Sequence, residues 1–438
     1  MPTQLADQVE LKSKTSTEIE EKDSLADYLL VTFSLTSLVF NNVLGALAII
    51  GFLAPWMVIM ARKSSTAISA FRQYWPLFLL PLLDLASAIW SHDKMASIKS
   101  ALELVPTIMI GLAAATCVQM RPLIAATLTS LATAIGLSVV TMWGQLTSAE
   151  ETSSLTGVFG SKNAFAYNVC LLMLTSYPAL IDKKQRIYFR LCGLFSILFG
   201  PILLYFAHSL GAVLSIIITF SLYFFGSALR KLPTPLRILL ILFVAGTGSL
   251  ILIAYLAGAF DSKTILALMG KSATLTGRTL LWQVALDSFD SNPLFGVGYQ
   301  GFWILSNPKA QILWDYFDVT PGPGFNFHNE YMEALVEIGL IGLTLEVFFL
   351  ARVTLNTFNL AAKEKSFGQI FTFLIFVFHL IRTPTEVAIF YQFCTGMIFF
   401  CMSWVMLKPN PAIDRTTRRA TSRYRRRITR QEGRRAST

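Results

Sequence analysis

The chain has 438 residues, of which 54% are hydrophobic and only 14% are charged. Soluble globular domains carry about a quarter charged residues, so this composition argues against an ordinary soluble protein. The apolar residues form repeated runs long enough to cross the ~30 Å of hydrocarbon in a bilayer as helices. Short alternating strands, typical of an outer-membrane barrel, are missing. The sequence therefore predicts an all-α fold, a polytopic integral membrane protein.

The N-terminal residues 1–27 are polar, mixed in charge and without hydrophobic periodicity. Glu10, Glu18, Glu20 and Glu21 argue against a secretory signal peptide, which has a basic start and an early apolar core. We expect this segment to be a disordered extension on the cytoplasmic side.

About twelve transmembrane helices are expected. Asn41 and Asn42 interrupt the apolar stretch from Tyr28 to Met60, which we divide there into two short spans. Ten further apolar runs have the length of a span. They cover residues 74–90, 101–118, 122–143, 163–181, 188–206, 209–229, 236–259, 334–353, 368–387 and 389–407.

Basic residues between the spans predict the orientation. With a cytoplasmic N-terminus and alternating spans, the inside loops hold fourteen basic residues and the outside segments hold eight. Lysine and arginine favour cytoplasmic loops, so this orientation is preferred. In a bacterium it places the protein in the inner membrane with both termini in the cytoplasm. The parts are the N-terminus (1–27), nine transmembrane helices (28–259), a periplasmic loop (260–333), three transmembrane helices (334–407) and a tail (408–438).

The tail contributes much of the formal net charge of +10. From Lys408 onward the chain has eleven basic and two acidic residues. Such a run fixes the orientation and contacts anionic lipid headgroups, at ~1 kcal/mol per basic residue near the surface. Because no folded nucleic-acid-binding module accompanies it, we expect membrane lipids as its partner and no nucleic acid.

The periplasmic loop holds most of the residues outside the membrane that can do chemistry. Arg278 follows Gly277 and opens a helical pattern. Polar residues share one face of this helix, and they are Gln283, Asp287 and Asp290. Apolar residues form a stripe beside that face, and they are Trp282, Leu286 and Phe289. Such a helix either lies in the headgroup plane or packs on the spans.

A glycine-rich string follows this helix. Residues from Gly296 to Gly301 read G-x-G-x-x-G, but a dinucleotide site needs a strand before the glycines, and a helix and Pro293 precede them. We therefore expect a tight, close-packed turn. Residues 303–325 are rich in aromatic side chains, including Trp303 and Trp314. Exposed aromatic residues would suit sugar stacking or, more commonly, an interfacial belt.

His328 stands where the loop meets the next apolar run. Histidine is readily poised as a base near neutral pH, although a structural histidine at the start of a helix is an equal alternative. Glu330 and Glu333 follow on the first turns, and Arg278 offers a planar fork suited to phosphate. The histidine spacing does not indicate a zinc site, and no metal is expected. The five cysteines lie in or beside apolar runs as small apolar residues.

With these residues in view, the sequence resembles the O-antigen ligase/polymerase superfamily, the Wzy- and WaaL-type membrane glycosyltransferases. The features that carry the resemblance are His328-Asn329 followed after nine residues by Gly339 and Gly342, Gly277-Arg278 with Trp282, the string from Pro293 to Gly298, and the segment from Gly157 to Asn163. The length, the twelve-span topology and the single large loop are similar to those of ExoQ-type exopolysaccharide polymerases.

The resemblance implies a transferase without metal or cofactor. Its donor would be a glycan on a polyprenyl diphosphate, and its acceptor a hydroxyl group. A flippase and a chain-length regulator are implied as partners. His328 would act as the base and Arg278 would stabilise the departing diphosphate, with inversion at the anomeric carbon. We assign acceptor or sugar contacts to four residues: Trp282, Asn329, Glu330 and Tyr331.

One departure from the family pattern concerns diphosphate binding. The family often has Ser-Arg-Gly at the outer start of a mid-chain span, whereas this chain has Leu210 in place of the arginine. Three outside-facing residues are candidates to replace it: Lys162, His208 and Arg382. Arg382 has Glu386 four residues on. Charges inside a membrane are costly and often functional, although this pair could also be structural.

Polymerisation is preferred to ligation because the layout is similar to that of the exopolysaccharide polymerases. A solute transporter is the alternative from another class. Against it, the sequence shows no convincing internal repeat of the kind many transporters have, and the extramembrane residues are concentrated on one side. A purely structural membrane subunit would leave Arg278 and His328 unexplained.

Overall fold

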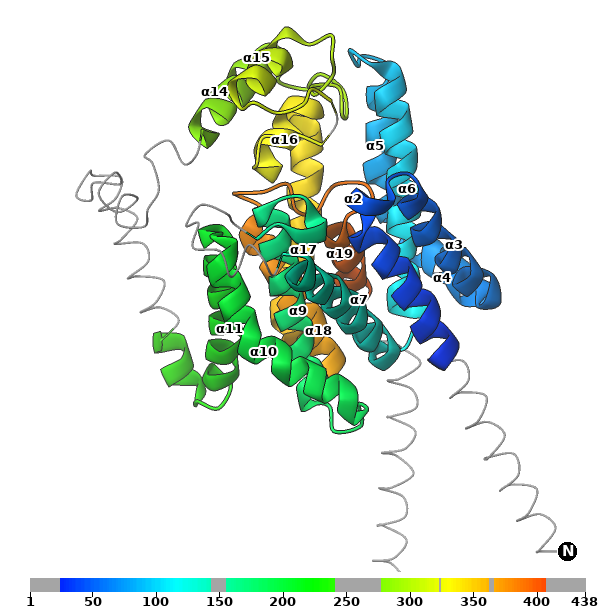
Figure 1. Ribbon diagram of the computed structural model, residues 1–438. Coiled ribbons are helices and arrows are strands. Elements are labelled where there is room, and N and C mark those ends of the chain that lie inside the picture. The colour runs from blue at the N-terminus through cyan, green and yellow to red at the C-terminus, as the bar shows by residue number, and fades with distance from the viewer. Residues whose placement is uncertain (1–23, 143–154, 241–276, 323, 362–365, 407–438) are drawn as a thin grey trace, which may run out of the picture.

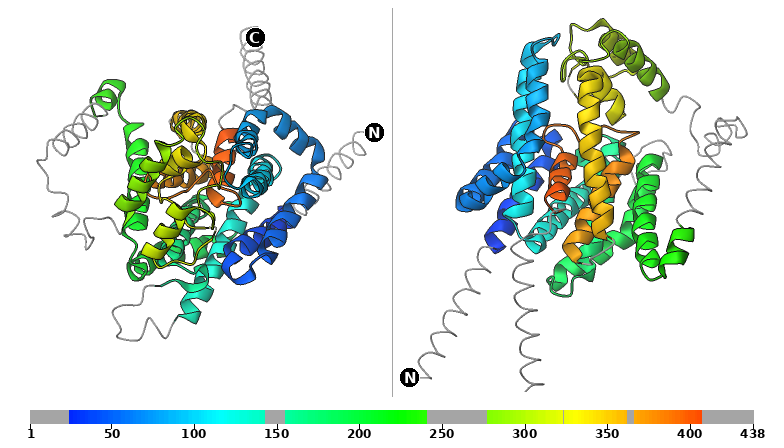
Figure 2. Two further views of the ribbon diagram at one scale, coloured as in Figure 1. Left: turned by 90° about the horizontal axis from the view of Figure 1, so that it is seen from above. Right: turned by 180° about the vertical axis from the view of Figure 1, so that it is seen from behind.

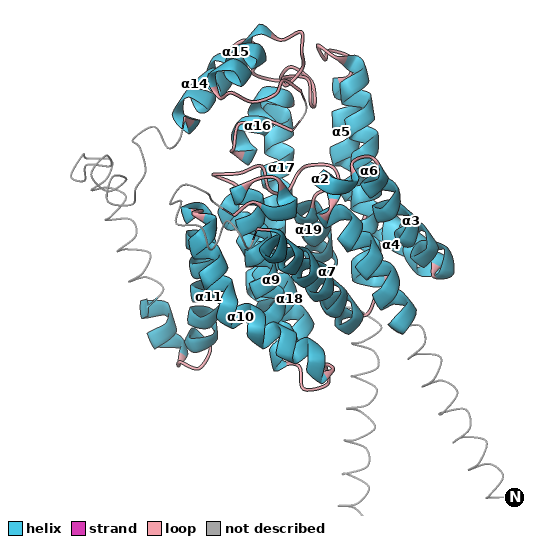
Figure 3. Ribbon diagram, in the orientation of Figure 1, coloured by secondary structure: helices cyan, strands magenta, loops and turns pink. Residues whose placement is uncertain are grey.

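The computed structural model describes residues 24–142, 155–240, 277–322, 324–361 and 366–406. Within these ranges the regular secondary structure is helical (Figure 3). The expected all-α class is therefore confirmed. The whole of the tail lies outside the described residues, as do parts of the expected N-terminal extension, of the span at 236–259 and of the periplasmic loop.

The first half of the chain forms a series of apolar helices and two short 3₁₀ turns. These are Ser24–Val39, α2 (Asn41–Leu44), α3 (Leu47–Arg62), α4 (Ser64–Gln73), η1 (Trp75–Phe78), α5 (Leu79–Ser87), α6 (Lys94–Thr116), α7 (Met120–Thr141), η2 (Gly157–Phe159), α9 (Lys162–Ile181), α10 (Ile187–Ala207) and α11 (Leu210–Leu229). The second half contributes α14 (Arg278–Phe289), α15 (Pro308–Tyr316), α16 (Glu330–Glu337), α17 (Gly339–Ala361), α18 (Phe367–Arg382) and α19 (Thr395–Met406).

Six of the described helices are long and apolar enough to cross a membrane: α6, α7, α9, α10, α11 and α17. A seventh span results if α3 and α4, which meet at an angle of 101°, are counted as one broken span. The protein is thus a multi-pass membrane protein, while the count of twelve spans stays a prediction.

The helices differ in how far they are buried inside the bundle. In α9, 67% of the most apolar stretch is buried, compared with 28% in α10 and 22% in α11. Helix α9 packs against α7, α10 and α18, which makes it a central helix. Figures 1 and 2 show α10 and α11 along one side of the bundle, where their apolar side chains can face lipid.

The expected break at Asn41 and Asn42 is confirmed. The first helix ends in a turn at Phe40, and the one-turn helix α2 ends at Gly45, whose φ of +55° lies in the left-handed region. The Asn42 side chain donates to the carbonyl of Phe159 at 2.6 Å. The break therefore fastens the start of the chain to the segment that leads into α9.

The expected spans at 334–353, 368–387 and 389–407 have other boundaries. Residues 330–337 form a separate helix, α16, because the chain turns at Gly339 with a φ of +66°, where a Cβ would lie 2.4 Å from the Leu294 carbonyl. Helix α18 ends at Arg382, and α19 begins only at Thr395. Pro384 explains the first of these ends, because proline has no backbone N–H to continue the helical hydrogen bonds.

The cap of the molecule consists of α14, α15 and α16 at one end of the bundle (Figures 1 and 2). The glycine-rich turn joins this cap to the bundle. A Cβ on Gly296 would lie 2.5 Å from the Glu337 backbone, and one on Gly298 would lie 2.3 Å from the Ser91 side chain. The prediction of a close-packed turn is confirmed, and the glycines serve backbone contact.

Burial in the cap contradicts the expected exposure of two tryptophans and leaves the two alternatives for α14 open. In α14 the buried face is Leu281, Ala285 and Ser288, whereas Leu286 of the expected apolar stripe is 45% exposed. The buried face is rotated because Leu281 and Ala285 pack into an aromatic cluster of the cap. Trp303 and Trp314 belong to that cluster and are 4% and 0% exposed, so they serve neither as an exposed sugar platform nor as a belt.

Candidate active site

Arg278 begins α14 and points toward the segment between α18 and α19. Gly277 precedes it with a φ of +84°, and a Cβ there would lie 2.5 Å from the Phe317 ring. This left-handed residue sets the direction in which α14 starts. The Arg278 Nη2 atom donates to Glu386 Oε1 at 2.7 Å, and the side chain is 19% exposed.

His328 reaches the same carboxylate from the start of α16. Its backbone has a φ of +50°, and its N–H donates to Asn326 Oδ1 at 2.9 Å. The next residue, Asn329, caps α16 by accepting hydrogen bonds from the amides of Tyr331 and Met332. His328 therefore lies just outside the helix, with its ring fixed by a 2.9 Å bond from Nδ1 to Glu386 Oε2.

This contact defines the chemistry of the imidazole. When Glu386 is ionised, it accepts a hydrogen bond from the Nδ1–H of His328, so the neutral ring carries its lone pair on Nε2. A carboxylate on one ring nitrogen orients the ring and raises the basicity of the other nitrogen. The His328 side chain is 29% exposed, which leaves room for a reacting group to approach.

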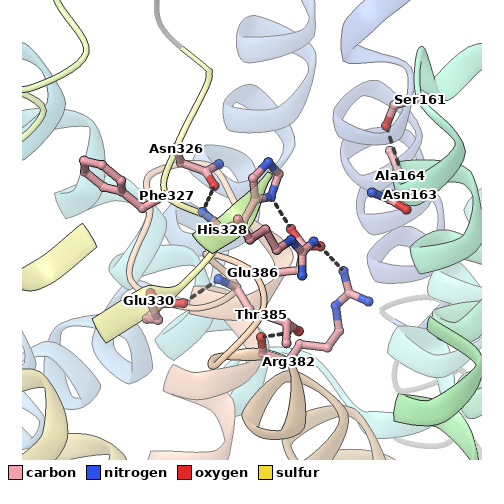
Figure 4. Close-up of polar contacts among 12 residues, drawn as sticks. Ser161, Asn163, Ala164, Asn326, Phe327, His328, Glu330, Arg382, Thr385 and Glu386 are labelled. Carbon is pink, nitrogen blue, oxygen red and sulfur yellow. Dashed lines mark hydrogen bonds and ion pairs between the residues drawn. The ribbon is translucent and has the colours of Figure 1, made fainter. Parts of the chain in front are cut away.

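Glu386 is the shared partner of three basic side chains. Burial opposes its ionisation, but the His328 hydrogen bond and the charges of Arg382, His328 and Arg278 outweigh burial and lower its pKa below the ordinary value. Arg382 Nη2 lies 3.9 Å from Glu386 Oε1. Figure 4 shows the Glu386 carboxylate between the side chains of His328 and Arg382. Glu386 is therefore an anion at neutral pH.

Arg382 is fixed by aromatic rings at the end of α18. Its guanidinium carbon lies 5.3 Å from the centre of the Tyr167 ring and 5.5 Å from that of Phe378. The Tyr167 hydroxyl contacts His379 Nε2 at 2.7 Å and the Thr395 hydroxyl. Tyr167 thereby links α9 and α18 and places a buried cation beside the Glu386 carboxylate.

The other two candidate diphosphate residues lie at neighbouring helix ends. Lys162 is the first residue of α9, capped by the Ser161 side chain, and His208 ends α10 with a φ of +50°. Ser209 donates to Asn163 Oδ1 at 3.0 Å and thus joins these two ends. Within the described part of the chain, no bond joins Lys162 or His208 to Glu386. The structure therefore brings Arg278, Arg382 and His328 together. Lys162 and His208 lie instead at the joined ends of α9 and α10.

The four residues assigned to acceptor or sugar contacts make internal contacts. Trp282 Nε1 donates to the carbonyl of Phe327 at 3.0 Å, and the Tyr331 hydroxyl contacts that of Thr383 at 2.9 Å. Asn329 caps α16, as described above. Glu330 is 3% exposed and accepts hydrogen bonds from backbone amides of residues 388–390. Their roles as glycan contacts stay predictions.

Sequence reasoning noted Glu386 only as a partner of Arg382, in a pair that could be functional or structural, and missed its contact with His328. The signal was present in two features. Arg382 and Glu386 put opposite charges into an expected span, and Pro384 between them predicts that the helix ends there. A non-helical segment at the edge of the membrane is a place where a charged side chain can turn toward a site.

The described residues contain no group of three or more His, Cys, Asp or Glu side chains that could hold a metal ion. The donors around Glu386 are mainly cationic or imidazole nitrogens, which suit an anion rather than a metal. The arrangement combines an oriented imidazole, a buried anion and two guanidinium groups. Chemically it can accept a proton at His328 Nε2 and stabilise negative charge at Arg278 and Arg382.

The chain is similar to known proteins over much of its length. Residues 194–347 match the O-antigen ligase family. The chain is also 26% identical over 317 residues to the exopolysaccharide production protein ExoQ of Rhizobium meliloti (strain 1021), and the match covers 72% of each protein. Both matches support the O-antigen ligase/polymerase superfamily. The family indicates a glycosyl-transfer enzyme in polysaccharide assembly with lipid-linked glycans as substrates.

The family match includes Arg278 and His328 but ends before Arg382 and Glu386. Arg382 was already a candidate from the sequence, whereas Glu386 is assigned to the site because the structure brings the segment after α18 against the start of α16. The exopolysaccharide relative also accords with the ExoQ-like layout inferred from the sequence.

Proposed function

We propose that this chain polymerises polyprenyl-diphosphate-linked repeat units into a cell-surface polysaccharide at the periplasmic face of the bacterial inner membrane. The observation that carries this proposal is the carboxylate of Glu386, which binds Arg278 at 2.7 Å and His328 at 2.9 Å. One cation for a diphosphate and one oriented base for a hydroxyl are the two groups that glycosyl transfer from a diphosphate requires.

The base in this proposal is Nε2 of His328. It accepts the proton of the acceptor hydroxyl while the hydroxyl oxygen forms a bond to the anomeric carbon of the donor. Glu386, hydrogen-bonded to Nδ1, stabilises the resulting imidazolium. This role matches that of an ionised carboxylate, because Glu386 has a lowered pKa.

The leaving group is the polyprenyl diphosphate. As the bond from the anomeric carbon to the diphosphate oxygen breaks, its electron pair leaves on the diphosphate, which needs cations and no acid. The bond to Glu386 uses one of the five N–H donors of Arg278, and the others can bind phosphate oxygens. Arg382, Lys162 and His208 supply further positive charge. Direct displacement without a metal inverts the anomeric centre.

Ligation is the second candidate, because the matched family is described as an O-antigen ligase. In that case the same step would transfer a finished glycan to a lipid or protein acceptor. The two reactions share the donor and the base and differ only in the acceptor hydroxyl.

The test is a gene deletion in the source bacterium, complemented with wild type or with His328→Ala, followed by sizing of the lipid-linked glycans. We expect the deletion and the His328→Ala strain to accumulate single lipid-linked repeats and to lose long chains. Long chains that stay on the lipid carrier would instead identify a ligase. Wild-type glycans in a strain with normal levels of the His328→Ala protein would contradict the site.

A transporter is tested separately with purified protein in proteoliposomes. If the glycan profile is unchanged by the deletion and solute uptake depends on the protein, the glycosyltransferase proposal fails. Membrane levels of each variant are measured by immunoblot, so that loss of protein is not mistaken for loss of chemistry.

A further inference from the structure

The segment of residues 383–394 lies between α18 and α19 and carries Glu386. Its start is bound to the end of α18, because the amides of Thr385 and Glu386 both donate to the Arg382 carbonyl at 2.8 Å. Three amides beyond Glu386 are bound by one side chain from the cap. The Glu330 carboxylate accepts hydrogen bonds from the amides of Ala388, Ile389 at 2.9 Å and Phe390 at 2.7 Å. These three amides begin two residues after Glu386.

The same residue also fastens the segment on the other side of Glu386. The backbone N–H of Glu330 donates to the carbonyl of Thr383 at 2.9 Å, and the neighbouring Tyr331 hydroxyl contacts the Thr383 hydroxyl at 2.9 Å. The first turn of α16 thus holds the chain both before and after Glu386. Since His328 lies two residues before Glu330, the base and its carboxylate are fixed to one short helix.

Glu333, one turn further along α16, completes the support from the other side of the base. Its carboxylate accepts from the amide of Phe327 at 2.8 Å and from Trp303 Nε1 at 2.9 Å. Phe327 directly precedes His328. The two glutamates therefore bind different parts of the site. Glu333 binds the residue that precedes His328, and Glu330 binds the segment that carries Glu386.

We propose that Glu330 is a positioning residue, which holds Glu386 against His328 and Arg278 and does not itself contact the glycan. All of the hydrogen bonds that the Glu330 carboxylate accepts come from backbone amides, and the residue is 3% exposed. The expected effect of Glu330 on kcat rests on the proposed function. Its expected effect on the backbone of residues 383–394 does not.

The structural consequence can be measured without substrate, by hydrogen–deuterium exchange of the full-length protein in lipid nanodiscs. Glu330→Gln replaces one acceptor oxygen with an amide that faces a backbone donor. We expect faster exchange in peptides that cover residues 383–394, by about tenfold, equivalent to about 1.4 kcal/mol. Glu330→Asp keeps the carboxylate on a shorter side chain and should lie between Glu330→Gln and wild type.

The matched control for this experiment is Glu337→Gln. It removes a buried carboxyl from the same short helix, and within the described residues the Glu337 side chain makes no hydrogen bond with Phe327 or with residues 388–390. We expect wild-type exchange in the 383–394 peptides of this variant. Equal exchange in Glu330→Gln and wild type would overturn the positioning role. Faster exchange over the whole cap would also overturn it, because Glu330 would then be a general stabilising residue.

The kinetic consequence is a double-mutant cycle of Glu330→Gln and Glu386→Gln. The substrate is the pool of lipid-linked repeat units extracted from the deletion strain, supplied to purified protein. We expect Glu330→Gln to lower kcat about tenfold with KM within about twofold, since it acts through Glu386. In the Glu386→Gln background the same change should cost less than about twofold.

Independent losses in this cycle would mean that Glu330 does not act through Glu386, and a large rise in KM would indicate direct glycan contact. Either result overturns the inference. Failure of the proposed function has a different signature, because the wild-type protein itself would then transfer nothing. The exchange experiment would still decide whether Glu330 holds the segment.

Discussion

Two groups of carboxyl side chains lie in the outer part of this molecule and differ in their charge partners. Glu386 contacts Arg278 and His328, and these basic groups lower its pKa although burial opposes ionisation. On α16, burial raises the pKa of Glu333 to about 8 and that of Glu337 well above the ordinary value. The partners of Glu333 are the N–H groups of Phe327 and Trp303, and Glu337 Oε1 has no hydrogen-bond partner.

The difference shows that charged partners, and not burial alone, decide whether a buried carboxyl group is ionised. All of these side chains are largely removed from water, which penalises the charged form. Only Glu386 has cations close enough to reverse that penalty. It is therefore the ionised group suited to a proton-transfer site, whereas burial favours the protonated form of Glu333 and Glu337, which suits a supporting role.

Replacement of Arg278, which binds Glu386, should have the largest effect on the transfer rate. Arg278→Ala is expected to lower kcat by about 10²–10³-fold, which is typical when one group that stabilises developing negative charge is lost. Arg278→Lys should recover only part of the activity, because an ammonium group cannot bind two oxygens in a planar fork. The measurement is transfer by purified protein, with extracted lipid-linked repeat units as donor and acceptor.

The control for Arg278→Ala is Gln283→Ala, which changes an exposed side chain on the same helix. Near-wild-type kcat is expected for this control. If Arg278→Ala retained kcat within about twofold of wild type in folded protein, Arg278 would be only a structural partner of Glu386.

Loss of the charge on Glu386 should have the next largest effect. Glu386→Gln can still accept one hydrogen bond but cannot stabilise an imidazolium by charge, so kcat should fall about 10–100-fold. The variant should remain folded. The Arg278 side chain is partly exposed to solvent, and the segment that carries residue 386 is still bound to Glu330 through its backbone amides. Wild-type kcat in Glu386→Gln would contradict the proposed partnership with His328.

The lowered pKa of Glu386 also predicts a sign for stability against pH. A carboxyl whose folded pKa is lowered stabilises the fold above its unfolded pKa, and this contribution is lost as pH falls through the folded value. Wild type should therefore lose Tm on acidification below the ordinary carboxyl range more steeply than Glu386→Gln. Parallel Tm curves for the two proteins would show that Glu386 gains nothing from its basic partners.

Glu333 should show the opposite dependence on pH. Its raised pKa means that the folded state binds the proton more tightly, so stability falls as pH rises from about 4.5 through about 8. Glu333→Gln removes the titration and should flatten Tm over this range, after an initial loss of about 1 kcal/mol for one broken hydrogen bond. Tryptophan fluorescence during heating, recorded at several pH values in nanodiscs, measures this. An unchanged slope in the variant would mean that Glu333 is not the protonated group.

The sequence predicted the membrane class and several local features for clear physical reasons. A long apolar run in a bilayer forms a helix, because the backbone N–H and C=O groups have no water to bind there. Asn41 and Asn42 are polar residues inside such a run and therefore predict a break in it. The close-packed turn at Gly296 also followed from glycine alone. Arg278 and His328 were singled out by residue type and by resemblance, and the structure places both on the Glu386 carboxylate.

What the sequence did not predict depends on contacts between distant segments. Glu386 lies 58 positions from His328 and 108 from Arg278, and no local periodicity reports such a contact. Hydropathy merged residues 383–394 into two expected spans, because Ile389 and Phe390 are apolar. Three amides there donate to the Glu330 side chain instead of to helix carbonyls, and a local sequence pattern does not reveal such a long-range contact.

The smallest effect is expected for Glu337→Gln. Glu337 is 2% exposed and lines a small pocket with Tyr299 and Gln300, and its Oε1 has no hydrogen-bond partner. Because the carboxyl is held neutral by burial, a neutral carboxamide of nearly equal shape should change Tm by about 2 °C or less and kcat by less than about twofold. The same assays as above measure both.

This variant is the sharpest test of the comparison between the two groups. A large fall in kcat with unchanged Tm would mean that the Glu337 pocket contacts a reacting group, and the supporting role assigned to α16 would fail. A large fall in Tm that is absent at acidic pH would instead mean that Glu337 is ionised in the native state. With neither change, the ionised carboxylate of the site is Glu386, and the acids of α16 act by holding the backbone around it.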